Sequence, residues 1–430
     1  MQTLNKQSPY RVLLIAEAAN PEWVSVPLVG WSLSRAIADV THAHLVTQVR
    51  NRAAILRAGL TEGEDFTAID NEYVAAPLFK LSNLLRGGIG VGWTTASAFS
   101  SLSYYAFERE VWLKFRGRLK AGEFDIVHRI TPLSPTSQSI ITKRVAKLGI
   151  PFVLGPLNGG VPWPKGFIDR QHAEKEWLAH VRGLYKLLPG YRSTRKCSSA
   201  IIVGSKHTYE QMPDWAKSKC VRIPENGVDL TRFSSPRTRS ASLPLRAAFV
   251  GRLVPYKGAD MLLKAATEYV KRGKLQLHII GDGPQRQALE ALAGRAGIDS
   301  NVIFHGWVPH HDVQATLRDC DFLALPSVRE FGGGVVIEAM ALGVAPVVAD
   351  YAGPAELVED GIGLRVPFSD ASSLIDGFHQ AIGKLIANPK MLDDIGAAAR
   401  RKVLERYTWD AKAEQVIEVY DRVIADRRKG

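Results

Sequence analysis

Residues 319–356 read DCDFLALPSVREFGGGVVIEAMALGVAPVVADYAGPAE, and this stretch decides the fold. A short apolar strand at 322–325 ends in a polar turn that carries Glu330. A run of glycines at 332–334 leads into an apolar helix, and a second strand follows at 345–349. Strand, glycine turn, helix and strand in this order predict a parallel βαβ unit.

The glycine turn at 332–334 is suited to binding a phosphate, because glycine lets the backbone approach a ligand without interference from a Cβ. The unpaired N–H groups and the positive end of the helix face the same space, which favours an anion such as a diphosphate. Glu338, early in the helix, can accept hydrogen bonds from two ribose hydroxyls, and Glu330 can reach a sugar ring. The alternative is a flexible glycine loop with two solvated glutamates, and the flanking apolar strands favour the ligand site.

The spacing of Glu330 and Glu338, followed by Ala-Met-Ala-x-Gly and by Pro-Val-Val at 346–348, resembles the signature of the retaining glycosyltransferases of family four. The resemblance covers roughly residues 224–427 and is weaker before them. It implies the GT-B fold, an α/β architecture of two facing Rossmann-like domains with a cleft between them. It also implies a C-terminal helix that crosses back onto the first domain.

A chain of 430 residues is expected to form two domains. The Asn-Gly-Val-Asp sequence at 226–229 resembles the family's interdomain segment. We therefore expect an N-terminal acceptor-binding domain at 1–222, joined by the helix at about 409–430, and a nucleotide-sugar-binding domain at 223–408. The Arg/Ser-rich run at 233–243 is expected to be a linker or a surface loop.

The net charge of +12 lies entirely in the N-terminal half. Residues 1–222 contain 29 Lys and Arg against 17 Asp and Glu, whereas residues 223–430 contain 26 of each sign. This asymmetry indicates an anionic partner for the first half, and no recognisable module indicates nucleic acid. Three scattered cysteines without metal-ligand spacing and an early first strand without room for a signal peptide favour a cytoplasmic protein.

Two basic stretches with interleaved aromatic residues, 104–120 and about 174–186, leave two interpretations open. They suit an anionic membrane surface, or the aromatic residues are core and the charges form a solvated face. The uncharged run at 87–107 has the length of a membrane span, but its glycines, serines and threonines argue against one. We therefore expect at most a peripheral contact with an anionic membrane, on its inner face.

A second phosphate motif begins the C-terminal domain, where the strand at 247–250 runs into Gly-Arg-Leu-Val-Pro-Tyr-Lys-Gly. Arg252 offers a guanidinium fork and Lys257 a point charge, and the alternative is two surface cations. The motif also matches the family, and the resemblance implies that both cations neutralise the leaving diphosphate without a metal or a resident cofactor.

The residues expected to act on donor and acceptor follow from these motifs and from the resemblance. The expected catalytic residues are Arg252, Lys257, Glu330 and His128. The expected donor-binding residues are Gly30, Asn226, Gly306, Trp307, Val308, Gly332, Gly333, Gly334, Val335 and Glu338. The candidates for the acceptor side are Asn20, Trp23, Ser25, Asn158 and Gly159. His128 ends a strand, but family members often have His-x-His here and this chain has Ile130 in the second place, so a structural histidine is equally open.

These observations predict a glycosyltransferase that moves a sugar from a nucleotide-sugar to a lipid-linked or anionic cell-envelope glycan, as in polysaccharide biosynthesis. The resemblance implies that the reaction retains the anomeric configuration. Alternatives are a soluble small-molecule acceptor, a non-catalytic nucleotide-sugar-binding protein, or a sugar phosphorylase with a lysine-linked cofactor. The base of the nucleotide (UDP, GDP or ADP) stays open. Asp319 and Asp321 form an Asp-x-Asp sequence, but Asp321 leads directly into a buried strand and is expected to be structural.

Overall fold

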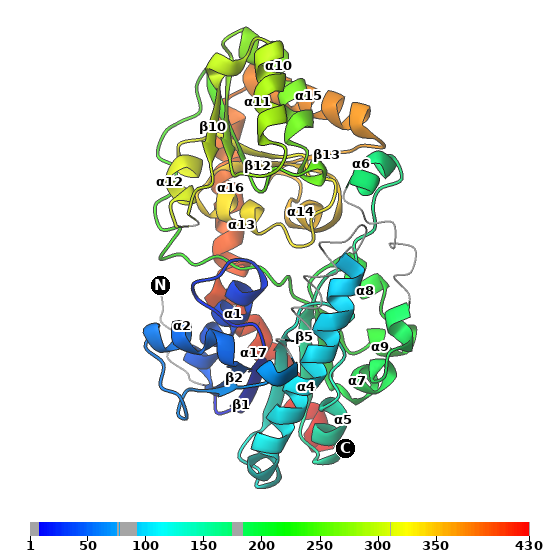
Figure 1. Ribbon diagram of the computed structural model, residues 1–430. Helices are drawn as coiled ribbons and strands as arrows, with labels where there is room; N and C mark the ends of the chain where they lie inside the picture. The colour runs from blue at the N-terminus through cyan, green and yellow to red at the C-terminus, as the bar shows by residue number, and fades with distance from the viewer. Residues whose placement is uncertain (1–7, 75–76, 78–92, 174–183, 310, 430) are drawn as a thin grey trace. The chain divides into compact units, whose positions relative to one another are not determined.

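The computed structural model describes residues 8–74, 77, 93–173, 184–309 and 311–429 (Figure 1). The polypeptide folds into two compact units. The first comprises Met1–Gly160, Lys175–Glu225 and Trp409–Gly430, and the second comprises Val161–Glu174 and Asn226–Thr408. The chain thus passes into the second unit after Glu225, three residues later than expected. A segment expected in the first domain, Val161–Glu174, belongs to the second unit.

The first unit is built on a seven-stranded parallel sheet in the order β3-β2-β1-β4-β5-β6-β7. Its strands are β1 (Arg11–Ala16), β2 (His42–Gln48), β3 (Phe66–Ile69), β4 (Ile126–Thr131), β5 (Phe152–Leu157), β6 (Ala200–Val203) and β7 (Cys220–Arg222). The central strand β1 is apolar and buried after its exposed first residue, Arg11, because a parallel sheet is covered on both faces.

Helices cover both faces of this sheet. They are α1 (Val26–Val40), α2 (Arg52–Arg57), α4 (Trp93–Lys120), α5 (Thr142–Lys147), α7 (Tyr191–Cys197), α8 (Lys206–Glu210), α9 (Asp214–Lys217) and α17 (Trp409–Lys429), with short 3-10 turns η1 (Val49–Asn51) and η3 (Leu184–Leu187). Helix α17 packs beside α1, where Val416 and Tyr420 join a core with Leu14 and Leu33. The expected C-terminal helix that returns to the first domain is therefore confirmed.

The second unit is built on a six-stranded parallel sheet in the order β10-β9-β8-β11-β12-β13. Its strands are β8 (Leu245–Val250), β9 (Leu275–Ile280), β10 (Val302–Gly306), β11 (Phe322–Leu325), β12 (Ala345–Ala349) and β13 (Leu364–Val366). Its helices are α6 (Ile168–Ala173), α10 (Ala259–Lys271), α11 (Arg286–Arg295), α12 (Val313–Arg318), α13 (Gly334–Ala341), α14 (Ala352–Leu357), α15 (Ala371–Ala387) and α16 (Lys390–Arg406), with turns η4 (Pro255–Lys257) and η5 (Asp299–Asn301).

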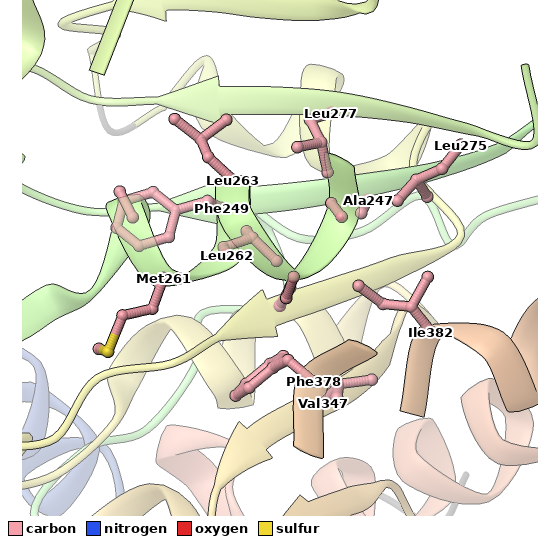
Figure 2. Close-up of a cluster of buried hydrophobic side chains, with 14 of the residues drawn as sticks. Ala247, Phe249, Met261, Leu262, Leu263, Leu275, Leu277, Val347, Phe378 and Ile382 are labelled. Atoms are coloured by element: carbon pink, nitrogen blue, oxygen red, sulfur yellow. The ribbon is translucent and has the colours of Figure 1, made fainter. Parts of the chain in front are cut away.

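Side chains from α10 and α15 pack on one face of this sheet, as Figure 2 shows for Met261, Leu262, Phe378 and Ile382. These helices present an apolar face at the period of 3.6 residues. Helix α15 begins at a capping box, in which the backbone N–H of Ser373 donates to Asp370 at 2.8 Å.

Both sheets follow the doubly wound order 3-2-1-4-5-6, in which the direction of winding reverses between two adjacent strands. The reversal lies between β1 and β4 in the first unit and between β8 and β11 in the second. Ligands of doubly wound sheets bind at the carboxyl ends of the strands beside this reversal. No helix within the described residues is both long and apolar enough to cross a membrane.

Candidate functional site

Three adjacent strands of the second unit each end in a glycine with positive φ. Gly251, Gly281 and Gly306 follow or end β8, β9 and β10, with φ of 152°, 137° and 72°. The backbones touch here, because the N–H of Gly251 donates to Ile280 O at 2.9 Å and that of Gly281 to Gly306 O at 2.8 Å. A Cβ at Gly281 would lie 2.0 Å from Gly251 O, so only glycine fits. The glycines at the ends of these three strands therefore leave the backbone at this carboxyl edge without Cβ atoms.

Lys257 and Glu330 meet at the reversal point of the second sheet. Lys257 follows β8 and Glu330 follows β11, and the ammonium forms an ion pair with the Glu330 carboxylate. Burial by itself lowers the pKa of Lys257, but the charge and the hydrogen bond of Glu330 outweigh it and raise that pKa. Both side chains are mostly covered, with 14% and 20% of their surfaces exposed. The structure thus joins two predicted catalytic residues that are 73 positions apart in the chain.

The turns that carry this pair are held in close contact. Gly258 begins α10 with a φ of 76°, and a Cβ there would lie 2.6 Å from Pro326 O. Val328 N donates to Tyr256 O at 2.9 Å, which ties the turn after β11 to the turn after β8. The Lys257 side chain passes Gly251, since a Cβ built at Gly251 would lie 3.8 Å from its Cδ. These contacts fix the backbone on either side of the pair.

The glycine turn lies at the start of α13, as expected. Gly333 is the N-cap, with a φ of 61°, and the helix begins at Gly334. A Cβ at Gly334 would touch the Asn226 amide at 3.5 Å, so Asn226 lies beside the turn. Glu338 is partly exposed on the same helix, and Val335 is half-buried. The first N–H groups of α13 and one carboxylate therefore share the edge that holds Glu330.

The remaining expected donor residues of this unit lie at the same edge. Arg252 is exposed directly after Gly251. Trp307, after β10, exposes 74% of its surface, while Val308 packs against the core. Gly306 has a φ of 72°, which favours glycine, and a Cβ there would also displace an Arg286 nitrogen that lies 2.7 Å away. Apart from Asn226, the predicted catalytic and donor-binding residues of the second unit thus end or follow three of its strands, β8, β10 and β11.

Gly30 of the first unit was expected to bind the donor, and the structure gives it a packing role instead. It is buried in α1, and a Cβ there would lie 2.0 Å from Ala18 O. The glycine is needed for the close approach of the helix to the loop after β1, and it presents no surface to a donor.

His128 was among the expected catalytic residues, and the structure gives it a structural role as well. Its Nδ1 bonds the Tyr420 hydroxyl at 2.7 Å and its Nε2 bonds Gly155 O at 2.7 Å. The ring is fully buried, and burial lowers the pKa of His128 to about 4. Both nitrogens are thus used in joining β4, β5 and α17, which makes this the structural histidine.

Three of the acceptor-side candidates are structural as well. Asn20 is buried, and its Oδ1 accepts from Glu22 N at 2.9 Å, which shapes the loop after β1. Asn158 is buried against Glu225, to whose carboxylate its amide donates at 2.7 Å. Gly159 is buried, and its N–H donates to the Asn158 side chain. These side chains hold turns and offer little surface to an acceptor.

Trp23 and Ser25 remain exposed at the carboxyl edge of the first sheet. Trp23 exposes 48% of its surface, and Ser25 takes a φ of 66° immediately before α1. A positive φ is unusual for serine and places backbone strain at the start of this helix. These two residues stay as predicted candidates.

The sequence analysis missed Glu17, the first residue after β1. Burial raises the pKa of its carboxyl group, and the charge of Arg50 offsets part of that rise. A carboxyl group with a raised pKa at the reversal point of a doubly wound sheet is a common feature of ligand sites. In the sequence Glu17 is a lone glutamate after an apolar strand, and that pattern does not predict a ligand site.

Asp321 is structural, as the sequence indicates. It is fully buried and accepts from Arg237 at 2.7 Å, from Arg239 and from the Arg246 backbone at 2.7 Å. Arg237 also pairs with Asp393. Ion pairs of Arg237 and Arg239 with the buried Asp321 therefore hold the Arg/Ser-rich run at 233–243 against the second unit.

The C-terminal half of the chain matches a known family. Residues 233–402 match the model described as glycosyl transferases group 1. A curated relative from Mycolicibacterium smegmatis, named a GDP-mannose-dependent alpha-(1-6)-phosphatidylinositol monomannoside mannosyltransferase, is 32% identical over 212 residues, which are 45% of this chain and 54% of the relative. The chain spans about half the length of the curated relatives it matches.

Solved structures match nearly the whole chain. Sucrose-phosphate synthase from Thermosynechococcus elongatus superposes with a TM-score of 0.60 at 18% identity, over 97% of this chain and 100% of that one. Anabaena HepE in complex with UDP and glucose superposes with a TM-score of 0.55 at 15% identity, over 96% and 100%. At these identities the likeness shows the fold, and the two parallel α/β domains are those of GT-B proteins.

Proposed function

We propose that this chain, which has the GT-B fold and matches the glycosyl transferases group 1 model over residues 233–402, transfers a sugar from a nucleotide-sugar to an acceptor. The observation that carries the proposal is the Lys257–Glu330 pair at the reversal point of the second sheet. It combines a cation for a diphosphate with a carboxylate for sugar hydroxyls. The GDP-mannose in one relative's name and the UDP and glucose of Anabaena HepE support this donor class.

Donor binding exchanges the partner of Lys257 in this proposal. The diphosphate takes the ammonium, and Glu330 is released to accept hydrogen bonds from the sugar. Arg252 and Lys257 then stabilise the negative charge that develops on the diphosphate as its bond to the anomeric carbon breaks. The N–H groups of α13 add to this field, and Glu338 holds the ribose. These groups stabilise the leaving group without a metal or a resident cofactor.

The acceptor hydroxyl attacks the anomeric carbon on the face from which the diphosphate leaves, which retains the configuration. The new bond from carbon to the acceptor oxygen forms as the bond to the phosphate oxygen breaks, and the leaving phosphate takes the hydroxyl proton. Proton NMR of the first product tests this step. A product of inverted configuration would overturn it.

A thermal-shift panel of UDP, GDP, ADP and their sugars tests the donor site. At a ligand concentration about 100-fold above Kd, binding stabilises the protein by about 2.7 kcal/mol, a shift that is readily measured. We expect one nucleotide to raise the unfolding temperature, and Lys257→Ala to abolish the shift. Lys264→Ala, at an exposed position of α10, is the matched control. No shift with any nucleotide would contradict the proposed site.

Turnover separates the enzyme from a non-catalytic binding protein. An enzyme releases nucleoside diphosphate from its nucleotide-sugar when acceptor is added, whereas a binding protein shows the thermal shift without release. We propose the enzyme because Lys257, Glu330 and the glycine turn lie at one edge of the sheet.

We propose that the acceptor is a lipid-linked or anionic cell-envelope glycan, reached by peripheral contact with the inner face of a membrane. The structure changes which residues support the proposed membrane contact. The aromatic residues Tyr104, Phe107 and Phe115 are core, and most of the second basic stretch lies outside the described residues. The outer face of α4 instead supplies the surface.

That outer face is basic and partly apolar. Arg109, Trp112 and Arg116 lie at helical spacing on α4 and, with Leu113 and with Arg144 of α5, line a hollow of about 490 Å³. The Arg144 guanidinium lies 5.4 Å from the centre of the Trp112 ring.

An exposed leucine lies two residues along the chain from a contact of the same hollow. Tyr105, which also lines it, donates to Pro189 O at 2.9 Å. Leu187, two residues before that proline, exposes 80% of its surface. Arginines for lipid phosphates beside exposed leucines for the acyl boundary suit an anionic bilayer.

Flotation with vesicles tests the membrane contact. We expect binding to vesicles of phosphatidylglycerol and phosphatidylcholine, but not of phosphatidylcholine alone. The triple change of Arg109, Arg116 and Arg144 to glutamate should abolish it, whereas Lys264→Glu on the second unit should not. Equal, negligible binding to both vesicles by the wild type would contradict the contact, and a soluble small-molecule acceptor would then be favoured.

A further inference from the structure

The segment 161–173, which we call the arm, belongs to the second unit, although the chain before Val161 and after Glu174 belongs to the first. Phe167 is 2% exposed and lies in the core of the second unit, with its ring 5.5 Å from Phe368 in an edge-on contact. Gly166 pairs with Asp370, and a Cβ there would lie 2.1 Å from Ser369 O. One buried ring and one close backbone contact therefore hold the arm in a fixed position within the second unit.

Arg170 of the arm holds both ends of the turn that carries Lys257. Its guanidinium donates to the two Asp260 carboxylate oxygens at 3.0 and 2.7 Å, and also to Pro255 O. Pro255 begins η4 and Asp260 lies in the first turn of α10, so Lys257 lies between the two anchors. A bidentate arginine–carboxylate pair fixes direction as well as distance.

Trp163 of the arm contacts the residue before each member of the Lys257–Glu330 pair. Its ring meets Tyr256 edge-on, with the ring centres 6.4 Å apart. The Arg329 guanidinium lies 5.3 Å from the centre of the same ring, and its Nε donates to Val161 O at 3.3 Å.

A further contact fixes the arm just before Trp163, where the Tyr351 hydroxyl donates to Pro162 O at 2.9 Å. The arm thus bridges the turns after β8 and β11.

We infer that the arm is a structural part of the donor site, and that Trp163 and Arg170 are positioning residues for Lys257 and Glu330. They act through Tyr256, Arg329, Pro255 and Asp260, and they do not touch the reacting atoms. Small displacements of such a pair weaken both its mutual attraction and its fit to a ligand. Only the kinetic consequence of this inference rests on the proposed function. The coupling between Lys257 and Glu330 is a property of the unliganded protein.

A double-mutant cycle tests the inference without any ligand. Lys257→Met, Glu330→Gln and the double variant give the coupling between the two residues from denaturant unfolding of the full-length chain. The cycle is then repeated in a Trp163→Ala background. We expect the coupling to fall by at least half in that background, and to be largely kept with Trp163→Phe.

The control for this cycle is Ile168→Ala, at an arm position that is 56% exposed. It should leave the coupling unchanged. If Trp163→Ala lowers overall stability and the coupling stays the same, the arm only adds packing energy and the inference is overturned.

Donor kinetics give the second readout. We expect Trp163→Ala and Arg170→Ala to lower kcat/KM for the nucleotide-sugar by about 10- to 100-fold at unchanged far-UV circular dichroism, with Trp163→Phe restoring most of the loss. Wild-type kinetics in both variants, at wild-type coupling, would overturn the inference. A wild-type protein that turns over no donor would overturn the proposed function, and the coupling would still decide the inference.

Discussion

Glu330 and Glu338 carry the same charge eight positions apart, but they have different surroundings. Glu330 is paired with Lys257, whereas Glu338 lies on α13 behind the glycine turn. In the proposed reaction Glu330 competes with the diphosphate for Lys257, and Glu338 holds the ribose. The two residues should therefore respond to the same substitution with opposite signs.

We expect Glu330→Gln to bind free nucleoside diphosphate about 5-fold more tightly than the wild type, because it removes a competing ion pair worth about 1 kcal/mol. The same change should lower kcat/KM for the nucleotide-sugar by at least about 10-fold, because a hydrogen bond to the sugar is weakened. Glu338→Gln should instead weaken binding of the free diphosphate. Isothermal titration on both variants distinguishes these outcomes, and equal weakening would refute the exchange of partners.

His128 should make the protein sensitive to acid. Its folded pKa is lowered to about 4 from 6.5, so below pH 6.5 the unfolded chain binds a proton that the folded chain does not. Stability is therefore complete above pH 6.5 and is lost as pH falls toward 4, by about 2 kcal/mol between pH 7 and pH 5.

Denaturant unfolding of the wild type and of His128→Gln at both pH values measures this. The variant should be less stable at pH 7 but should lose less on acidification. His42→Gln, at an exposed position, is the control and should keep the wild-type pH dependence.

At the scale of the element, Gly258 shapes the end of the turn between β8 and α10. Gly258 has a φ of 76° and faces Pro326 O, whereas Gly273, just beyond the end of α10, has a φ of 64° and open space around it. Gly273→Ala should cost about 1 kcal/mol of strain, and Gly258→Ala should cost more because the Cβ also collides. Only Gly258→Ala should weaken nucleotide binding. Equal effects at the two positions would argue against the tight turn.

The run at 233–243 is held by buried charge. We expect Asp321→Asn to lower the free energy of unfolding by about 3 kcal/mol, because Arg237 and Arg239 lose their shared carboxylate. Asp319→Asn, at the exposed aspartate two positions earlier, should change stability little. Chemical denaturation measures both variants, and a large effect at Asp319 would refute the structural assignment of Asp321.

The sequence predicted the elements whose signals are local. The strand at 322–325, the glycine turn and the helix that follows it are confirmed, because apolar runs and glycines act over a few residues. The arm could not be predicted, because Phe167 joins a core whose other buried residues lie between 245 and 395 in the chain. His128 was ambiguous for the same reason, since its partner Tyr420 lies 292 positions away.

At the scale of the whole molecule, the first unit depends on the end of the chain. Val416, Tyr420 and Val423 of α17 lie in the same core as β1 and α1. We expect a chain that ends at residue 408 to leave this core open, so that the first unit is digested rapidly in limited proteolysis. A chain that ends at residue 426 loses no buried residue among those that the structure describes and should resist like the wild type. Equal resistance of the two chains would show that α17 is dispensable.

The arm and α17 together set an order in which the protein can be completed during its synthesis. At about 5–20 residues per second, Phe167 emerges many seconds before Leu374 and Phe378, whose core it joins. Strands β1 to β5 of the first sheet emerge earlier still, but their core with α1 also includes residues of α17, which are made much later. The first unit therefore cannot complete its core before α17 has been made, whereas every segment of the second unit precedes that helix.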